Sequence, residues 1–165
     1  MRANLVVDRA TPADVPAMLA LLETLFAEHE HLGEQFAPAP QWRARMGAWL
    51  RAGLHDPARY LAVARAADQI VGLVSATVRE VPAFAESPRG LIENLVVAPG
   101  RRRVGLGRRL AEAAAAWCEQ RGALAIELAV AVDNADGQAF WEACGFEPAM
   151  TWRRRPLGPA AREQR

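Results

Sequence analysis

The sequence predicts an α/β domain in which helices flank a mixed β-sheet, and three observations carry this prediction. The chain has 165 residues, 52% of them hydrophobic, which suits one packed core. Apolar residues alternate in some segments, as in strands, and recur every three to four positions in others, as in helices. The elements so indicated do not alternate regularly along the chain, which favours a mixed sheet over a doubly wound parallel one.

The N-terminal third predicts a strand and two helices. A β-branched run at residues 5–7 indicates the strand, and Thr11 followed by Pro12 supplies an N-cap hydroxyl and a proline at the first helical position. The first helix should fray near residues 31–33, and a loop containing Gly and Pro separates it from the second. Apolar residues at helical spacing support both helices, namely Val15, Met18, Leu21, Leu22, Leu25 and Phe26 in the first, and Trp42, Met46, Trp49 and Leu50 in the second.

The middle of the chain predicts three strands. Residues 60–64 and 70–78 are apolar and β-branched, and the segment 66–69 between them has the length of a hairpin turn. These two strands should therefore pair antiparallel. A loop containing prolines then leads to a third strand at 91–97, which is stopped by Ala98-Pro99-Gly100.

The C-terminal third predicts two helices and two strands. Helical spacing and many alanines indicate a helix over residues 105–121, with Gly122 as its C-cap. Residues 125–132 favour a strand and residues 134–144 a helix. A last strand, or a pair of short ones, is predicted at 146–154.

Composition and charge exclude several classes of protein. With 20 basic and 19 acidic residues the formal net charge is +1, so we expect neither a nucleic acid nor a membrane as partner. Cys118 and Cys144 lack metal-ligand spacing, which argues against a metal site and a disulfide framework. The apolar run before Asp8 is too short for a signal peptide, so a cytoplasmic location is expected. Residues 1–157 are predicted to form one domain and residues 158–165 a flexible tail.

The segment that carries chemistry lies between residues 92 and 110, where a strand and a turn lead into a helix rich in Gly and Arg at its start. Amides at a helix N-terminus lack partners within the helix, and the aligned peptide dipoles favour an anion there. Gly105 and Gly107 leave no Cβ to block a diphosphate. Charge-assisted contacts would come from Arg102, Arg103 and Arg108. The segment therefore predicts a phosphate-binding site.

Two known phosphate loops do not fit this segment. The Walker pattern Gly-x-x-x-x-Gly-Lys-Ser/Thr is absent, and Leu110 stands where a dinucleotide fingerprint needs its third glycine. Residues 101–109 taken alone could also form a solvated basic surface or a nucleic-acid patch. The preceding strand and the two glycines favour a coenzyme site instead.

Two spaced motifs point to a family. The first is Leu95-x-Val97-x-Pro99-x-x-Arg102-x-x-Gly105-x-Gly107. The second is Asn134-x-x-Gly137-x-x-Phe140-Trp141-x-x-x-Gly145-Phe146. The first resembles the acyl-CoA signature of the GNAT superfamily of N-acyltransferases, and the second resembles a downstream element of the same family. With the predicted order of elements, the resemblance covers residues 5–157.

The resemblance implies both a fold and a cofactor. The fold would be a central, mostly antiparallel sheet with a splayed parallel strand pair, 91–97 and 125–132, flanked by helices. The cofactor would be acetyl-CoA, with its pantetheine arm paired to backbone groups between the splayed strands. The implied cofactor-binding residues are Leu95, Val96, Val97, Arg102, Arg103, Val104, Gly105, Leu106, Gly107, Arg108, Asn134, Phe140 and Trp141.

The resemblance also implies a reaction. A primary amine of a small molecule, an antibiotic, a peptide or a protein would attack the acetyl carbon directly, and a backbone N–H near Leu95 would stabilise the oxyanion. Glu93 is the candidate catalytic base, because strand alternation would put its side chain on the same face as Leu95 and Val97. Asn94 would face the opposite side. Related proteins often dimerise, so a homodimer is consistent with the resemblance.

One residue departs from the family pattern and keeps an alternative open. The family often has a tyrosine at the position of Trp141, where it protonates the leaving thiolate, and an indole cannot do this. Tyr60 is the only tyrosine and matches no family position. A thiol with a pKa of about 8.5 leaves without such help, but a non-catalytic acyl-CoA sensor or interaction module is the alternative. His29, His31, Phe36 and Trp42 either line an acceptor pocket or serve as packing groups.

Overall fold

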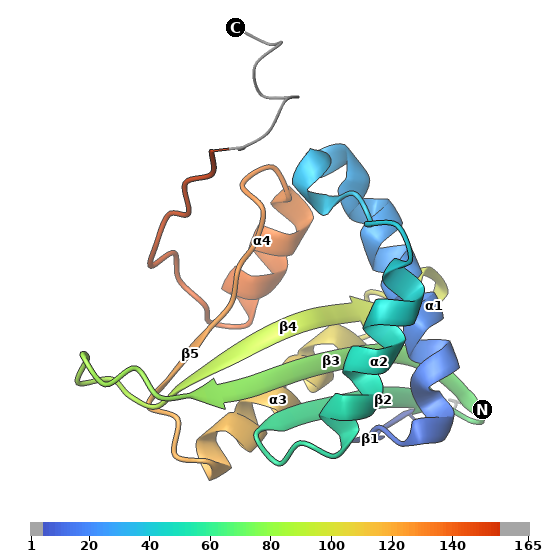
Figure 1. The fold of residues 1–165 in the computed structure, drawn as a ribbon, viewed down its shortest axis with the longest axis horizontal. Helices are drawn as coiled ribbons and strands as arrows, with labels where there is room; N and C mark the ends of the chain where they lie inside the picture. The colour runs from blue at the N-terminus through green and yellow to red at the C-terminus, as the bar shows by residue number, and fades with distance from the viewer. Residues whose placement is uncertain (1–4, 156–165) are drawn as a thin grey trace, which may run out of the picture.

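The computed structural model describes residues 5–155, which contain a five-stranded mixed sheet (Figure 1). The strands in order across the sheet are β1 (Leu5–Arg9), β2 (Arg59–Ala66), β3 (Gln69–Arg79), β4 (Arg89–Val97) and β5 (Ala125–Glu127). Neighbouring strands pair antiparallel from β1 to β4, whereas β4 and β5 pair parallel. The predicted mixed sheet is therefore confirmed. The predicted tail at residues 158–165 lies outside the described residues.

Helices lie on both faces of the sheet. Figure 1 shows α1 (Val15–His29) and α2 (Trp42–Leu54) on one face, α3 (Leu106–Gln120) on the other, and α4 (Ala135–Ala143) after β5 at the sheet edge. Short 3-10 turns connect the elements at Pro12–Asp14, Glu30–Leu32, Glu34–Phe36 and Pro99–Arg101. Within residues 5–155 no helix is long and apolar enough to cross a bilayer.

Each face of the sheet has its own apolar core. On the α1 and α2 face the core includes Met18, Leu22, Leu50, Leu73 and Val96. On the α3 face it includes Ala62, Leu110, Ala114, Trp117 and Cys118. The helical residues in both cores are those whose spacing of three or four predicted a buried stripe. Burial raises the pKa of the Cys118 thiol to about 11, so this cysteine stays protonated and serves as a small apolar residue.

The start of α1 is fixed by a polar cluster around Asp14. The Thr11 amide donates to the Asp14 carboxylate at 2.7 Å, and the Thr11 hydroxyl donates to it at 2.9 Å. Arg65 of β2 donates to both carboxylate oxygens, at 2.9 and 2.7 Å. These hydrogen bonds, the one from Arg65 above all, hold the pKa of Asp14 below its ordinary value against the opposing effect of burial. The cluster joins the first turn of α1 to the sheet.

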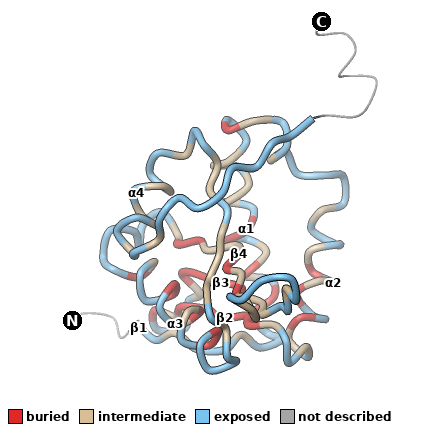
Figure 2. The backbone as a smooth tube through the Cα atoms, turned by 90° about the vertical axis from the view of Figure 1, so that its left-hand side faces the viewer, coloured by how far each residue is buried: buried red, intermediate tan, exposed pale blue. Residues whose placement is uncertain are grey.

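The strands predicted in the C-terminal third are the part of the fold that was wrong. Only Ala125–Glu127 of the predicted strand at 125–132 pairs with β4, and residues 146–155 form no strand at all. Trp152, which lies within the predicted last strand, is 83% exposed, and this end of the described chain lies on the surface (Figure 2). An alternating pattern makes a strand only where a neighbouring backbone accepts its hydrogen bonds. Residues 128–132 and 146–155 have no such neighbour among the described residues.

Candidate active site

The strand β4 carries a bulge that shapes the site. In the β3–β4 register Leu73 lies opposite Val96 and Ser75 lies opposite Glu93, so the pairing shifts at the residues between. Asn94 takes a positive φ of 51°, which asparagine tolerates better than most residues. Its side-chain amide donates to the Ser75 hydroxyl at 3.1 Å, and that hydroxyl donates to the Glu93 carbonyl at 3.1 Å. The bulge takes Asn94 and Leu95 out of the β3–β4 pairing.

The bulge changes which residues of β4 share a face. Leu95 and Val97 pack in the core on the α3 face, whereas the Asn94 side chain reaches Ser75 and lines a pocket beside α1 and α2. Asn94 thus faces away from Leu95 and Val97, as expected. The expectation that Glu93 shares the face of Leu95 and Val97 was wrong, because a bulge places two residues opposite one and interrupts the period of two. Glu93 lies opposite Ser75 in the register, and paired residues share a face.

The strands β4 and β5 separate soon after they meet. Their parallel pairing covers Arg89 to Leu91 against Ala125 to Glu127, and the chain after β5 then runs away towards α4 (Figure 1). Over residues 92–97, the edge of β4 that faces away from β3 thus has no strand partner in the described chain. This is the splayed strand pair expected from the sequence, and the free edge can accept an extended pantetheine arm.

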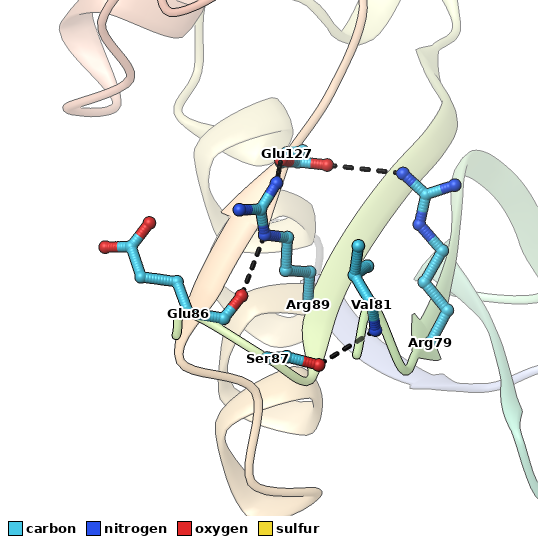
Figure 3. A network of polar contacts seen from close by, with 6 residues as sticks. All are labelled: Arg79, Val81, Glu86, Ser87, Arg89 and Glu127. Carbon is cyan, nitrogen blue, oxygen red and sulfur yellow. Dashed lines mark hydrogen bonds and ion pairs between the residues drawn. The ribbon is translucent and has the colours of Figure 1, made fainter. Parts of the chain in front are cut away.

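An ion-pair network closes the narrow end of this split (Figure 3). Glu127 of β5 accepts from Arg89 of β4 at 2.6 Å and from Arg79 of β3 at 3.3 Å. The Arg89 Nε also donates to the Glu86 carbonyl at 2.8 Å. One carboxylate therefore ties three strands together at their paired end, and the strands can diverge at the other end without the sheet separating.

The turn before α3 presents backbone amides without partners. The amides of residues 102–108 donate no hydrogen bond to any described residue, and the side chain of the N-cap residue, Gly105, can make none. Gly105 has a φ of +81° and residues 101–105 are exposed, whereas Leu106 is buried and fixes the first turn of the helix. Such amides at the positive end of a helix dipole form an anion site. The predicted location of the phosphate site therefore fits the structure.

The arginines of this turn have different surroundings. The Arg102 guanidinium donates to the Val97 carbonyl at 2.9 Å and to both Glu28 carboxylate oxygens of α1 at 2.6 and 2.8 Å. Arg108 donates to the Ala143 carbonyl at the end of α4. Arg103 is exposed and has no hydrogen bond or ion pair among the described residues. Arg102 and Arg108 thus hold the turn against its neighbours, and Arg103 has its charge free for a ligand.

The second motif fastens α4 to this turn. Asn134 caps α4 by accepting from the Gly137 amide at 2.9 Å. A Cβ on Gly107 would lie 3.1 Å from the Phe140 ring, so this glycine gives room to α4 as well as to a ligand. Trp141 packs edge-on against Phe140, with ring centroids 4.8 Å apart, and in the same way against Phe146.

The remaining predicted cofactor residues differ in exposure. Val104 is 62% exposed, whereas the Val96 side chain is buried in the core on the α1 and α2 face. Val96 can therefore meet a cofactor only through its backbone. Tyr60 lies in β2, stacked on Trp117 with ring centroids 5.4 Å apart, and burial raises its pKa. It is not among the residues that line the pocket beside the bulge.

A pocket of about 600 Å³ opens beside the bulge. Its walls come from α1, the turn Glu34–Phe36, α2 and Asn94 of β4. Burial lowers the pKa of His29, which lines it. Sequence reasoning had suggested His29, His31, Phe36 and Trp42 for an acceptor pocket. His31 does not line this one, and Arg45, Trp49 and Asn94 had been missed. The spacing of Trp42, Met46 and Trp49 on α2 was the available signal, but it also fits a purely structural helix face.

A free strand edge, an amide-rich helix start and an adjoining pocket define an acyl-CoA-dependent N-acyltransferase. Residues 18–146 match the model of the acetyltransferase (GNAT) family, and the chain belongs to that family. It is an N-acetyltransferase that uses acetyl-CoA. An aminoglycoside N(6')-acetyltransferase type 1 from Stenotrophomonas maltophilia is 31% identical over an alignment of 140 residues, and the match covers 76% of this chain and 92% of that protein.

Solved structures share the fold. A GCN5-related N-acetyltransferase from Ralstonia eutropha superposes with a TM-score of 0.78 at 21% identity, covering 94% of this chain and 100% of that one. An aminoglycoside 6'-N-acetyltransferase from Acinetobacter haemolyticus gives 0.72 at 19%, covering 93% and 99%. The aminoglycoside acetyltransferase AAC(6')-Iy, solved with a bisubstrate analogue that contains CoA, gives 0.71 at 19%, also covering 93% and 99%.

Proposed function

We propose that this protein acetylates the primary amine of a small molecule held in the pocket between α1, α2 and the β4 bulge. The observation that carries the proposal is the position of Asn94, which lines the pocket and belongs to the bulge next to the free edge of β4. An amine in the pocket and a thioester along that edge would therefore meet at the bulge. The curated relative and two of the structural neighbours also carry names of enzymes that act on small amines.

Bound acetyl-CoA would supply the acetyl thioester. Exposed amides of residues 102–108 would hold its diphosphate, with Arg103 adding a charge-assisted contact. The amide of Leu95, which the bulge removes from the β3–β4 pairing, would donate to the carbonyl oxygen as negative charge develops on it. A nitrogen–carbon bond forms, the carbon–sulfur bond breaks, and the amine proton must leave.

Proton removal is the step in which side chains act. An amine with a pKa near 10.4 is a free base in only about one molecule in a thousand at neutral pH. Glu93 is the proposed base, because its place opposite Ser75 puts it on the face of the bulge that borders the pocket. His29 is the competing candidate, since it lines the pocket and burial keeps its pKa low enough to leave it neutral at pH 7.

The leaving thiolate needs no acid from the protein. Trp141 is held between Phe140 and Phe146 and has no acidic proton to give, and Tyr60 lies elsewhere, in the core. A thiol with a pKa of about 8.5 leaves as the thiolate and takes its proton from water. The same proposal takes residues 1–157 as the catalytic domain and the cytoplasm as its compartment.

The proposal is tested by CoA thiol release from acetyl-CoA across a panel of amines. Turnover of at least one small amine is expected, and CoA binding without turnover of any amine would contradict the proposal. The base is then identified from the pH dependence of kcat/KM. If Glu93 is the base, Glu93→Gln lowers kcat/KM most at low pH and leaves acetyl-CoA affinity unchanged.

The matched variant His29→Gln separates the two bases. Because the pKa of His29 lies below 6.5, a histidine base predicts a rate that falls as pH drops below that value. In that case His29→Gln would remove this fall at low pH, the acid limb of the pH–rate profile, and Glu93→Gln would keep it. An acid limb that persists in Glu93→Gln and disappears in His29→Gln would reject Glu93.

A further inference from the structure

The pocket beside the bulge has several aromatic side chains in its walls. Phe26 and Trp42 meet edge to face with ring centroids 5.0 Å apart, and Phe36 lies beside His29 at 5.6 Å. Trp49 closes the α2 side, and the Arg59 guanidinium lies 4.2 Å from the centroid of its ring. A volume of about 600 Å³ lies within the range typical of small-molecule sites. The shape and lining therefore suit a flat apolar group.

The charge of the pocket is the second observation. None of the described residues that line it is Asp or Glu, and Arg45 is the one with a permanent charge. Of the acids beside the pocket, Glu28 binds Arg102 and Glu23 binds Arg43. Glu30 and Glu34 are exposed and do not line it. Glu93 does not line the pocket, and the proposed reaction needs it for a single amine, so no lining carboxylate can receive a second cation.

We infer that the acceptor is an arylalkyl monoamine, whose ring lies among Phe26, Trp42 and Trp49 and whose amine points to Asn94 of the bulge. This inference rests on the proposed function and adds the class of its substrate. A second ammonium group would be desolvated near Arg45 with no carboxylate as partner, which is unfavourable. The polycationic acceptor indicated by the name of the curated relative is therefore a poor substrate of this chain.

The test compares amines of matched size on the unaltered protein. 4-Methylbenzylamine and p-xylylenediamine differ by one added ammonium group, n-butylamine lacks the ring, and kanamycin is a polycation. We expect kcat/KM for 4-methylbenzylamine to exceed that for each of the others at least about tenfold, which corresponds to about 1.4 kcal/mol. Higher kcat/KM for kanamycin or the diamine would overturn this inference and leave the proposed function intact. Acetyl-CoA binding without turnover of any amine would overturn both.

Two variants test the electrostatic part on its own. Arg45→Glu reverses the charge at the pocket, and Gln35→Glu adds a carboxylate of the same shape to its wall. Each should raise the kcat/KM of p-xylylenediamine relative to 4-methylbenzylamine, the first by about tenfold. Arg51→Glu makes the same charge change on the same helix at an exposed residue outside the pocket, and it should leave the ratio unchanged. An equal ratio in all three variants would contradict the charge argument.

Discussion

The two halves of the site are built in different ways. On the proposed cofactor side, the groups free to contact acetyl-CoA are mainly backbone groups, namely the amides of residues 102–108 and the free edge of β4, with the Arg103 side chain beside them. On the acceptor side, the contacts are side chains that come from α1, α2 and one residue of β4. Every residue except proline offers the same backbone donor and acceptor, whereas side chains differ from one residue type to another.

This difference explains what each half can specify. A short local segment fixes a helix start, so the cofactor site depends mainly on where glycines allow particular backbone angles. The acceptor pocket depends on aromatic residues far apart in sequence, such as Phe26 and Trp49, that the packing of two helices brings together. Relatives can therefore keep the coenzyme and change the acceptor by substituting a few side chains.

The largest effect is expected for Asp14→Asn and concerns the free energy of unfolding. This variant weakens the polar cluster that joins α1, which forms a wall of the acceptor pocket, to the sheet. It leaves the turn at residues 102–108 unchanged. Asn cannot accept two charge-assisted bonds from Arg65, and losing one partner of a mostly buried pair costs about 3 kcal/mol of unfolding free energy. The pKa of Asp14 is lower in the folded protein than in the unfolded chain. The ionised carboxylate therefore contributes to stability at pH values above its unfolded-state pKa of about 4, and this contribution is lost as pH falls through its folded-state pKa.

Urea unfolding at pH 7 and at pH 3 measures this contribution. The variant should be less stable than the unaltered protein at pH 7, and the difference between their free energies of unfolding should be smaller at pH 3. A gap that is equal at both pH values would mean that the ionised carboxylate contributes no stability.

The next largest effect is expected for Gly105→Val on the cofactor side. A β-branched residue at a φ of +81° costs of order 1–3 kcal/mol, so the turn should distort and the acetyl-CoA dissociation constant should rise by up to about a hundredfold. Calorimetric titration with acetyl-CoA checks this. Gly100→Ala is the matched control, because no atom lies within 4 Å of the added Cβ and its φ is not positive. Equal affinities for the two variants would refute the role assigned to the turn.

The smallest effect concerns the contact that joins the two halves, Arg102 to Glu28. Both side chains are 40% exposed, so Glu28→Gln should cost only about 0.5 kcal/mol of stability. Arg102 keeps its bond to the Val97 carbonyl, and acetyl-CoA affinity should change less than twofold by that estimate. Thermal melts and the same titration measure both quantities. A large loss of acetyl-CoA affinity in Glu28→Gln would show that the cofactor turn depends strongly on its contact with α1.

Much of the fold could be predicted from the sequence because the signals are local. The helix at α3, its glycine N-terminus and the β2–β3 hairpin were confirmed, and each depends on residues close together in the chain. The strand at residues 146–154 was wrong for the opposite reason, since a strand needs a partner that local alternation cannot supply. The expectation that Glu93 shares a face with Leu95 and Val97 was wrong because one bulged residue shifts every later side chain by one position.

By itself the sequence determined where a diphosphate can meet exposed amides, because glycine positions and a helix start are properties of consecutive residues. Only the tertiary structure decided which side chains surround the acceptor and which arginines are already engaged. Arg102 meets Glu28 across 74 positions, and Asn94, which lines the pocket, is tied to β3 by the hydrogen bond from its side chain to Ser75. Such contacts depend on how distant segments pack, and no pattern within a single segment contains that information.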